Sequence, residues 1–341
     1  MRLLGSALRM LLAVVLSAVA VHAASAQAPG NGKAQGEVLA QANAALQAGE
    51  ADKALALLRS VMQSGANLAE AHNLECRVFF TLELWDAAVN ECEKAVSLDG
   101  QNSDYHMWLG RSLGEKANKA SFLSAYSLAK RTRAELEKAV QLNPRNAEAL
   151  ADLGEFYEAA PGVVGGGIEK AQGVAAKLDK VDPVRAHQLR GRIAEERKDY
   201  GTAEKEYKQS IAVSAHPALP WTTLANFYSQ RQRWSEMETA VHSCVSAVGR
   251  DKHSGVALYD GASILIGANR DLALATKMIE DYLAGSSKTE EAPAFVAYTR
   301  LARLKAQLGD AAGAKREQAA ALDLAHEYRP AQDLKRNETK H

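Results

Sequence analysis

An internal repeat constrains the fold of this chain more than any other feature of its sequence. Three segments align without gaps when Ala69, Val184 and Ala218 are taken as first positions. Each has an aromatic residue at position 17 and small or apolar residues at positions 20 and 28: Trp85, Ala88 and Val96; Tyr200, Ala203 and Ile211; Trp234, Met237 and Val245. A pattern that recurs along a chain predicts a stack of similar units, each packed against its neighbours.

The stretch from Ala134 to Tyr157 indicates what one unit contains. An amphipathic helix is expected to end at Asn143–Pro144, because proline donates no backbone N–H and disfavours helical angles in the residue before it. A second helix begins within three residues and carries one buried stripe, formed by Leu150, Leu153, Gly154 and Tyr157. The repeating unit is therefore predicted to be a pair of helices.

These residues resemble the tetratricopeptide repeat (TPR). The resemblance rests on Leu-x2-Leu-Gly-x2-Tyr from Leu150 to Tyr157 and on Ala-x4-Pro from Ala139 to Pro144. It implies an all-α fold, a right-handed superhelical solenoid of antiparallel helix pairs. It also implies a scaffold that binds other proteins through its concave face and carries out no catalysis. The composition agrees, since aromatic residues are only 6% and no stretch alternates apolar and polar residues over the length of a strand.

The N-terminus has the features of an export signal. Arg2 and Arg9 precede an apolar run over residues 10–21, and residues 24–26 are the small residues that a signal peptidase requires. We expect a signal peptide over residues 1–26, cleavage after Ala26 and a periplasmic or secreted protein without stable membrane insertion after cleavage. A retained membrane anchor is the alternative.

Four segments are expected along the chain. The signal peptide is followed by a flexible segment at residues 27–36, where Pro29, Gly30, Gly32 and Gly36 stand among small polar residues. Residues 37–328 are predicted to form about eight helix pairs, with insertions near 115–127 and 159–167. Residues 329–341 are expected to form a capping helix or a tail.

The charge balance bears on the class of partner. The chain has 41 basic and 41 acidic residues, and removal of the signal peptide takes away two arginines and no acidic residue. A nucleic-acid-binding protein would show a basic excess, so no nucleic-acid partner is expected.

The concave face is the predicted binding site. In the TPR family it is lined by positions 2, 5, 9 and 12 of each first helix. Four arginines occupy position 9, and a guanidinium group can hold a carboxylate through two hydrogen bonds, so a protein or extended peptide with acidic residues is the expected partner. The alternative is that these arginines are ordinary solvated residues. The selected residues are Asn73, Arg77, Phe80, Met107, Arg111, Glu155, Gln188, Arg192, Asn226 and Arg303.

A glycine-rich loop suggests a second function, the binding of a small ligand or anion between Pro161 and Ile168. It is not a P-loop, because Ile168 and Glu169 stand where lysine and serine or threonine should follow. Gly165, Gly166 and Gly167 nevertheless lead into a helix whose first N–H groups lack internal partners, and such groups can bind an anion. The alternative is a long turn that uses glycine for its backbone freedom.

The cysteines divide into a pair and a single residue. Cys76 and Cys92 stand at positions 8 and 24 of one unit, which face each other in an antiparallel pair. Either they form a disulfide in an oxidising compartment or they are two buried thiols. Cys244 is expected to be a free, buried thiol.

No catalytic residue, metal site or cofactor is predicted. None of the nine histidines stands in a recognised ligand spacing, and no Gly-x-Ser-x-Gly motif occurs. His72 and His187 share position 4 of their units, where packing explains them more simply than metal binding. The chain is therefore expected not to be an enzyme, with a hydrolase in the weakly matched region 251–287 as a remaining alternative.

Overall fold

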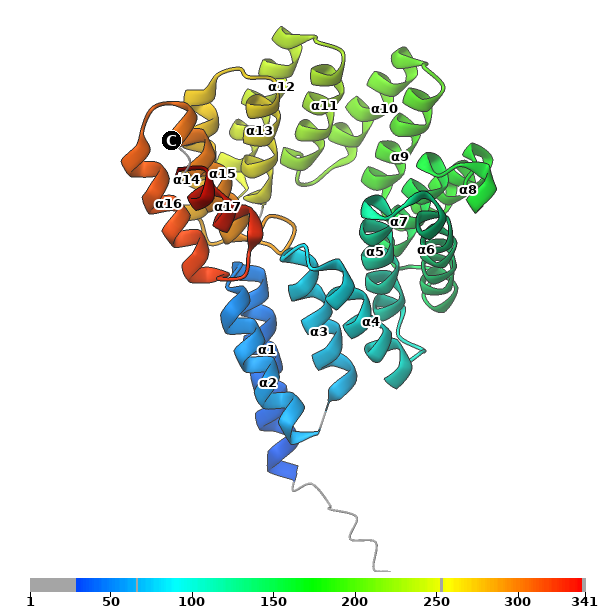
Figure 1. Cartoon of the computed structure of the whole chain (residues 1–341). Helices are drawn as coiled ribbons and strands as arrows, with labels where there is room; N and C mark the ends of the chain where they lie inside the picture. Colours follow the sequence, from blue (N-terminus) through cyan, green and yellow to red (C-terminus); the bar gives the residue numbers. More distant parts are fainter. Residues whose placement is uncertain (1–28, 66, 252–253, 339–341) are drawn as a thin grey trace, which may run out of the picture.

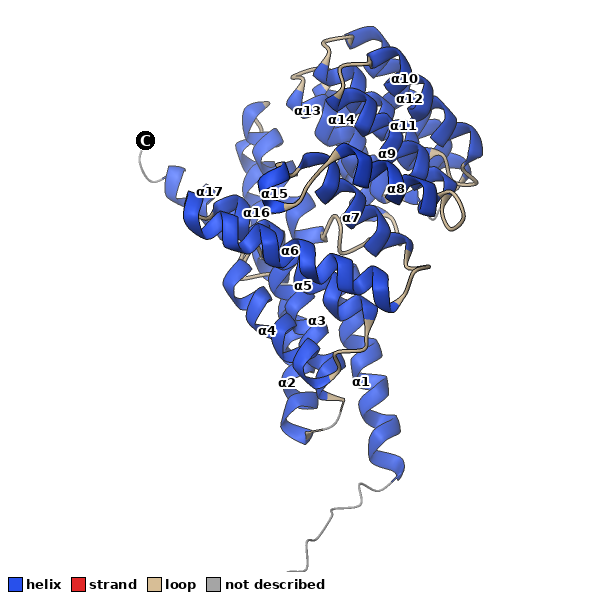
Figure 2. Cartoon of the chain, turned by 90° about the vertical axis from the view of Figure 1, so that its right-hand side faces the viewer, coloured by secondary structure: helices blue, strands red, loops and turns tan. Residues whose placement is uncertain are grey.

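The computed structural model describes residues 29–65, 67–251 and 254–338. These residues contain helices and loops and no strand (Figure 2). Within these ranges the helices form eight successive pairs: α1 (Pro29–Ala48) with α2 (Ala51–Ser64), α3 (Leu68–Thr81) with α4 (Trp85–Leu98), α5 (Ser103–Lys119) with α6 (Phe122–Leu142), α7 (Ala147–Ala159) with α8 (Ile168–Leu178), α9 (Pro183–Glu196) with α10 (Tyr200–Val213), α11 (Ala218–Gln230) with α12 (Trp234–Arg250), α13 (Val256–Gly267) with α14 (Leu272–Ala284), and α15 (Ala294–Gln307) with α16 (Ala311–Leu324). The last helix is α17 (Arg329–Glu338). The predicted all-α stack of antiparallel helix pairs is confirmed.

The repeated residues mark the turn between the two helices of a pair. Trp85, Tyr200 and Trp234 are the first residues of α4, α10 and α12. Two residues before each aromatic, at position 15, the backbone takes a positive φ, which is 60° at Glu83, 60° at Lys198 and 54° at Gln232. The small or apolar residues at position 20 are fully buried against the first helix. The repeat therefore encodes one helix–turn–helix geometry used three times.

The two expected insertions lengthen the pairs in different ways. The extra residues near 115–127 extend the helices, so that α5 has 17 residues and α6 has 21, whereas α3 and α4 have 14 each. The extra residues near 159–167 form a loop with a short 3-10 helix, η1 (Gly162–Val164).

The N-terminal boundary differs from the prediction. Helix α1 begins at Pro29, so residues 29–36 are helical and not a flexible segment. Proline is compatible with the first turn of a helix, because the N–H group that it lacks would have no partner there. Gln35 is 8% exposed, so this extension is packed against the fold. The predicted signal peptide and residues 27–28 lie outside the described residues.

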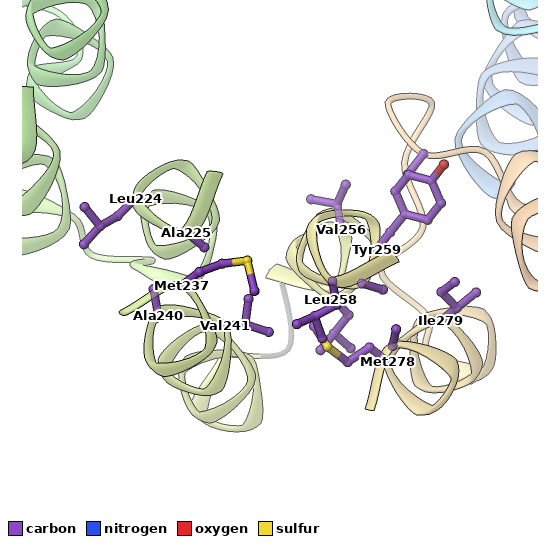
Figure 3. Close-up of a cluster of buried hydrophobic side chains, with 14 of the residues drawn as sticks. Leu224, Ala225, Met237, Ala240, Val241, Val256, Leu258, Tyr259, Met278 and Ile279 are labelled. Atoms are coloured by element: carbon purple, nitrogen blue, oxygen red, sulfur yellow. The ribbon is translucent and has the colours of Figure 1, made fainter. Parts of the chain in front are cut away.

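The core runs between successive pairs. Figure 3 shows one part of it, in which Met237 and Val241 of α12 face Leu258 of α13 and Met278 of α14, while Leu224 of α11 points to the opposite side of its helix. Each pair buries the apolar side of the next, as expected for a solenoid.

The two ends of the solenoid meet and close it into a ring. Figure 1 shows α15, α16 and α17 beside α1 and α2, and α2 contacts α16 directly. One buried cluster joins the two ends, with Leu39, Leu46 and Leu58 on one side and Phe295 and Tyr328 on the other. We call this contact the ring seam.

Backbone contacts at the ring seam are close. Gly49 lies between α1 and α2 with φ of 74°, and a Cβ atom there would lie 2.1 Å from the backbone nitrogen of Ala294. Polar contacts add to the apolar ones, since Asp52 pairs with His326 at 2.8 Å and the Tyr328 hydroxyl donates to Glu83 at 3.3 Å. A side chain at position 49 would push the two ends apart.

A disulfide bond joins Cys76 of α3 and Cys92 of α4, whose Cα atoms are 5.2 Å apart. Both residues are fully buried, and the Ser112 hydroxyl of α5 lies 3.5 Å from the Cys76 Sγ atom. The bond therefore ties together the two helices of one pair beside the next. Cys244 is free and buried, as expected from its distance along the chain.

No helix among the described residues is both long and apolar enough to cross a membrane.

Candidate functional site

The first helices of the pairs line the inner face of the ring. From α1 to α13, each of these helices contacts the first helix of the next pair, so that α1, α3, α5, α7, α9, α11 and α13 form a continuous layer (Figure 1). This layer is the concave face on which the binding residues were predicted.

Three hollows occur along this layer. The first has a volume of about 860 Å³ and lies between α3, α5, α6, α7 and the loop of residues 285–293. The second, of about 890 Å³, lies over α1, α3 and α5, and the third, of about 410 Å³, lies over α9, α11 and α13. Trp108 and Glu290 line both the first and the second hollow, and Glu155 lines both the first and the third. We call the three together the inner trough.

The structure brings most of the predicted binding residues together in the inner trough. The residues that line it are Asn73, Arg77, Phe80, Met107, Arg111, Glu155, Gln188, Arg192 and Asn226. Arg303 lies apart from them on α15, where its Nη2 atom donates to the carbonyl oxygen of Pro330 at 3.2 Å. Arg303 therefore fastens α17 to α15 and does not line the trough.

Each of the trough arginines Arg77, Arg111 and Arg192 already has a carboxylate partner in the chain. Arg111 donates to both oxygens of Asp152, at 2.6 and 3.3 Å, and its guanidinium lies 4.6 Å from the centre of the Trp108 ring. Arg192 pairs with Glu155 at 2.6 Å. Arg111 and Arg192 therefore each link their own first helix to α7, the first helix of a neighbouring pair. This role was not expected from their position in the repeat.

Arg77 has a partner from the opposite end of the chain. Its Nε and Nη2 atoms donate to the two carboxylate oxygens of Glu290 at 2.9 and 2.6 Å. Gln47 of α1 makes two hydrogen bonds to Glu290. Its side-chain nitrogen donates to the Glu290 carboxylate at 3.1 Å, and its side-chain oxygen accepts from the Glu290 backbone N–H at 3.3 Å. The loop of residues 285–293 is thereby held against α1 and α3, beside the ring seam.

Several trough residues were missed by sequence reasoning. They are Trp108, Asp152, Asp260, Glu290 and Glu291. Trp108 stands three residues before Arg111 on the same first helix, and an aromatic at this spacing from an arginine was a usable signal. Glu290 and Glu291 gave no signal, because their loop reaches the trough only through the closure of the ring.

Acidic side chains dominate the inner trough. Among the residues that the structure describes, the basic ones that line it are Arg77, Arg111 and Arg192, whereas the carboxylates are Glu70, Glu83, Asp104, Glu115, Glu148, Asp152, Glu155, Glu195, Asp260, Glu290 and Glu291. Burial and the nearby Glu291 carboxylate raise the pKa of Asp260 to about 6, although Arg300 opposes this shift. The trough is therefore a surface of negative potential.

The N–H groups of the three glycines in the glycine loop donate hydrogen bonds to backbone carbonyl oxygens of the chain itself. The N–H of Gly165 donates to the Gly162 carbonyl, that of Gly166 to Pro161 and that of Gly167 to Tyr157, at 2.9, 3.3 and 2.7 Å. A Cβ atom on Gly166 would lie 1.8 Å from the carbonyl oxygen of Ala160. Close backbone approach thus explains the glycine, and these three donors are occupied within the chain. The three glycine N–H groups are therefore not available to an anion, whereas the predicted anion site at the first N–H groups of α8 stays a prediction.

Three histidines join the two helices of their pairs. His72 contacts Glu91 at 2.7 Å, His187 contacts Glu206 at 2.7 Å and His106 contacts Glu135 at 2.6 Å, each through Nδ1. His72 and His187 stand at position 4 of their units, and their glutamates stand at position 23. At this shared position, each histidine therefore links the two helices of its pair through a hydrogen bond to a glutamate.

Comparison with known proteins gives distant similarities. No protein-family model matches the chain. Superkiller complex protein 3 of Mus musculus is 28% identical over 150 residues, which are 43% of this chain and 9% of that protein. The match thus spans less than a tenth of the length of that relative.

Two solved structures are similar to this chain at low identity. A thermophilic TPR protein of Thermus thermophilus is 15% identical, with a TM-score of 0.49, over 57% of this chain and 98% of that one. MamA is also 15% identical, with a TM-score of 0.32, over 49% of this chain and 90% of that one.

Proposed function

We propose that this chain, a ring of TPR-like helix pairs, is a scaffold that holds an extended segment of another protein in its inner trough. The observation that carries the proposal is that the three hollows lie next to one another along the first helices, with Trp108 and Glu290 lining both the first and the second and Glu155 lining both the first and the third. A groove of this kind suits a chain segment, whose backbone extends by about 3.3 Å per residue.

The charge of the inner trough favours a partner segment rich in lysine and arginine. Complementary charge steers association and selects among partners. An acidic segment, which the arginine positions suggested, would have to displace Asp152 from Arg111 and Glu290 from Arg77. A basic segment would instead meet carboxylates such as Glu115, Asp260 and Glu291 without breaking these pairs.

A scaffold of this kind requires no chemistry of its own. Cys244 is not suited to act as a nucleophile. Burial and the Asp260 carboxylate raise the pKa of its thiol to about 12, and the thiolate is the nucleophilic form. Its Sγ atom donates to the Ala257 carbonyl oxygen at 3.4 Å. Asp260, a buried acid in the weakly matched region 251–287, lines the binding trough. Its proposed role is therefore to contribute negative charge to that surface.

Neutralising trough carboxylates is expected to weaken the binding of a basic peptide. Glu115→Gln, Asp260→Asn and Glu291→Gln together should reduce the affinity for a short lysine-rich peptide roughly tenfold, which is about 1.4 kcal/mol. The measurement is isothermal titration at low salt, with a glutamate-rich peptide of equal length as the second probe.

The matched control is the triple variant Glu169→Gln, Asp323→Asn and Glu327→Gln, which removes three carboxylates that do not line the trough. It should bind the lysine-rich peptide as the wild type does. Tighter binding of the glutamate-rich peptide to the wild type would instead support the arginine-based interpretation of the trough.

We also propose that the protein is exported and acts in the periplasm or outside the cell. The features of residues 1–26 carry this proposal, and the Cys76–Cys92 disulfide supports it, because such bonds persist in oxidising compartments. Cell fractionation followed by N-terminal sequencing should find a mature protein that begins at Gln27. Recovery of the chain with Met1 or Arg2 at its start would argue for a retained anchor.

A further inference from the structure

A cluster of three potential metal ligands lies between α3 and α4, outside the contacts described for the trough. His72 and Glu75 are three residues apart on α3 and so share one helix face, and Glu91 faces them from α4. One ligand atom from each lies within 4.8 Å of the other two. The side chains of His72 and Glu91 are 17% and 11% exposed, so the cluster is largely shielded from water.

The ligand chemistry selects a class of ion. Zinc accepts both imidazole nitrogen and carboxylate oxygen as ligands, and a site with three protein ligands leaves the fourth position to water. Calcium and magnesium prefer oxygen ligands alone, whereas imidazole suits zinc and related transition metals. We propose that His72, Glu75 and Glu91 bind a divalent transition-metal ion of the zinc type.

The local charge supports this assignment. One carboxylate oxygen of Glu75 lies within 4.8 Å of one of Glu91, and two carboxylates this close repel each other when both are ionised. Lys94 contacts the Oε1 atom of Glu91 at 2.7 Å, which leaves the Oε2 atom facing His72. A divalent cation among the three ligands would neutralise this repulsion.

The chain contains its own comparison site in the pair α9–α10. His187 and Glu206 occupy the same repeat positions as His72 and Glu91, at the same distance of 2.7 Å. The position equivalent to Glu75 holds Arg190, which pairs with Asp179. This second pair therefore has a positive side chain where the first has a third ligand, and it is not expected to bind metal.

Titration of the tag-free full chain with zinc chloride tests the site. The wild type should bind a single equivalent, and Glu75→Gln and His72→Asn should each weaken binding at least about tenfold, since each removes a ligand. His187→Asn removes the comparison histidine and should leave zinc binding unchanged. Far-UV circular dichroism confirms that the variants remain folded.

Thermal unfolding gives a second readout that does not depend on the titration. Zinc should raise the Tm of the wild type and of His187→Asn but not that of Glu75→Gln, because an ion that binds only the folded state stabilises it. Glu75→Gln keeps the size of the side chain, so it decides the matter even if His72→Asn fails to fold. Absence of zinc binding by the wild type, or equal binding by Glu75→Gln, would overturn the assignment.

Discussion

Replacing Phe295 by alanine is expected to lower the free energy of unfolding by about 3–5 kcal/mol and to open the ring. Phe295 is 1% exposed and belongs to the cluster that joins the first and last helix pairs. Its ring packs edge-on against that of Tyr328, with centroids 4.8 Å apart. Truncation leaves a cavity in the cluster at the ring seam, where the first and last helix pairs pack against each other.

Chemical denaturation and small-angle X-ray scattering measure the two effects of Phe295→Ala separately. The midpoint of unfolding should fall, and the radius of gyration of the still folded protein should rise as the ends separate. Phe122→Ala is the control, because Phe122 is 85% exposed and its removal should change neither quantity. An unchanged stability together with an unchanged radius would show that the ring seam does not hold the ends together.

Replacing Ala203 by glutamate is expected to destabilise the ring by on the order of 4 kcal/mol. Ala203 is fully buried at position 20, in the contact between α10 and its neighbours, with Ala194 and Tyr207 in the same cluster. A carboxylate there would lose its hydration without gaining a partner. Neighbouring pairs support one another in a solenoid, so the loss should spread beyond α9 and α10.

Hydrogen exchange followed by mass spectrometry checks the Ala203→Glu prediction along the chain. Protection should fall most in α9 and α10 and next in α8 and α11. Gln209→Glu adds the same charge at an exposed site of α10 and should leave protection close to that of the wild type. Equal protection in the two variants would contradict the proposed packing of position 20.

The helix pairs could be predicted because their determinants are local. The turn at position 15, the aromatic at position 17 and the small residue at position 20 act within one unit, so three aligned copies were sufficient to define it. The start of α1 was not predicted correctly, because glycine-rich composition outweighed the compatibility of Pro29 with a first helical turn. Packing against the rest of the fold stabilises this extension, and composition alone cannot show that packing.

The inner trough could be predicted only in part. Periodicity placed Asn73, Arg111 and Gln188 on the inner face correctly, because the position within a first helix decides which way a side chain faces. It could not reveal that Arg77 is held by Glu290, which is 213 residues away. That contact depends on the closure of the ring, and closure depends on the summed rotation of the successive pairs.

The cluster of His72, Glu75 and Glu91 could not be predicted either, because its members are separated along the chain. Glu75 lies one helical turn from His72 and could have been noticed, but Glu91 joins them from the next helix. A ligand set divided between two helices leaves no contiguous motif. The contrast between Glu75 and Arg190 likewise depends on the histidine–glutamate contact that each pair forms between its two helices.

Site-specific photo-crosslinking in the native host tests binding in the inner trough most directly. A photoreactive residue is placed at Asn226 or Asn118, which line the trough, and at Gln209 or Glu169, which are exposed and do not line it. A partner held in the trough predicts crosslinks from the first two positions alone, to a segment rich in lysine and arginine. Crosslinks to another protein from Gln209 or Glu169, with none from the trough positions, would contradict it.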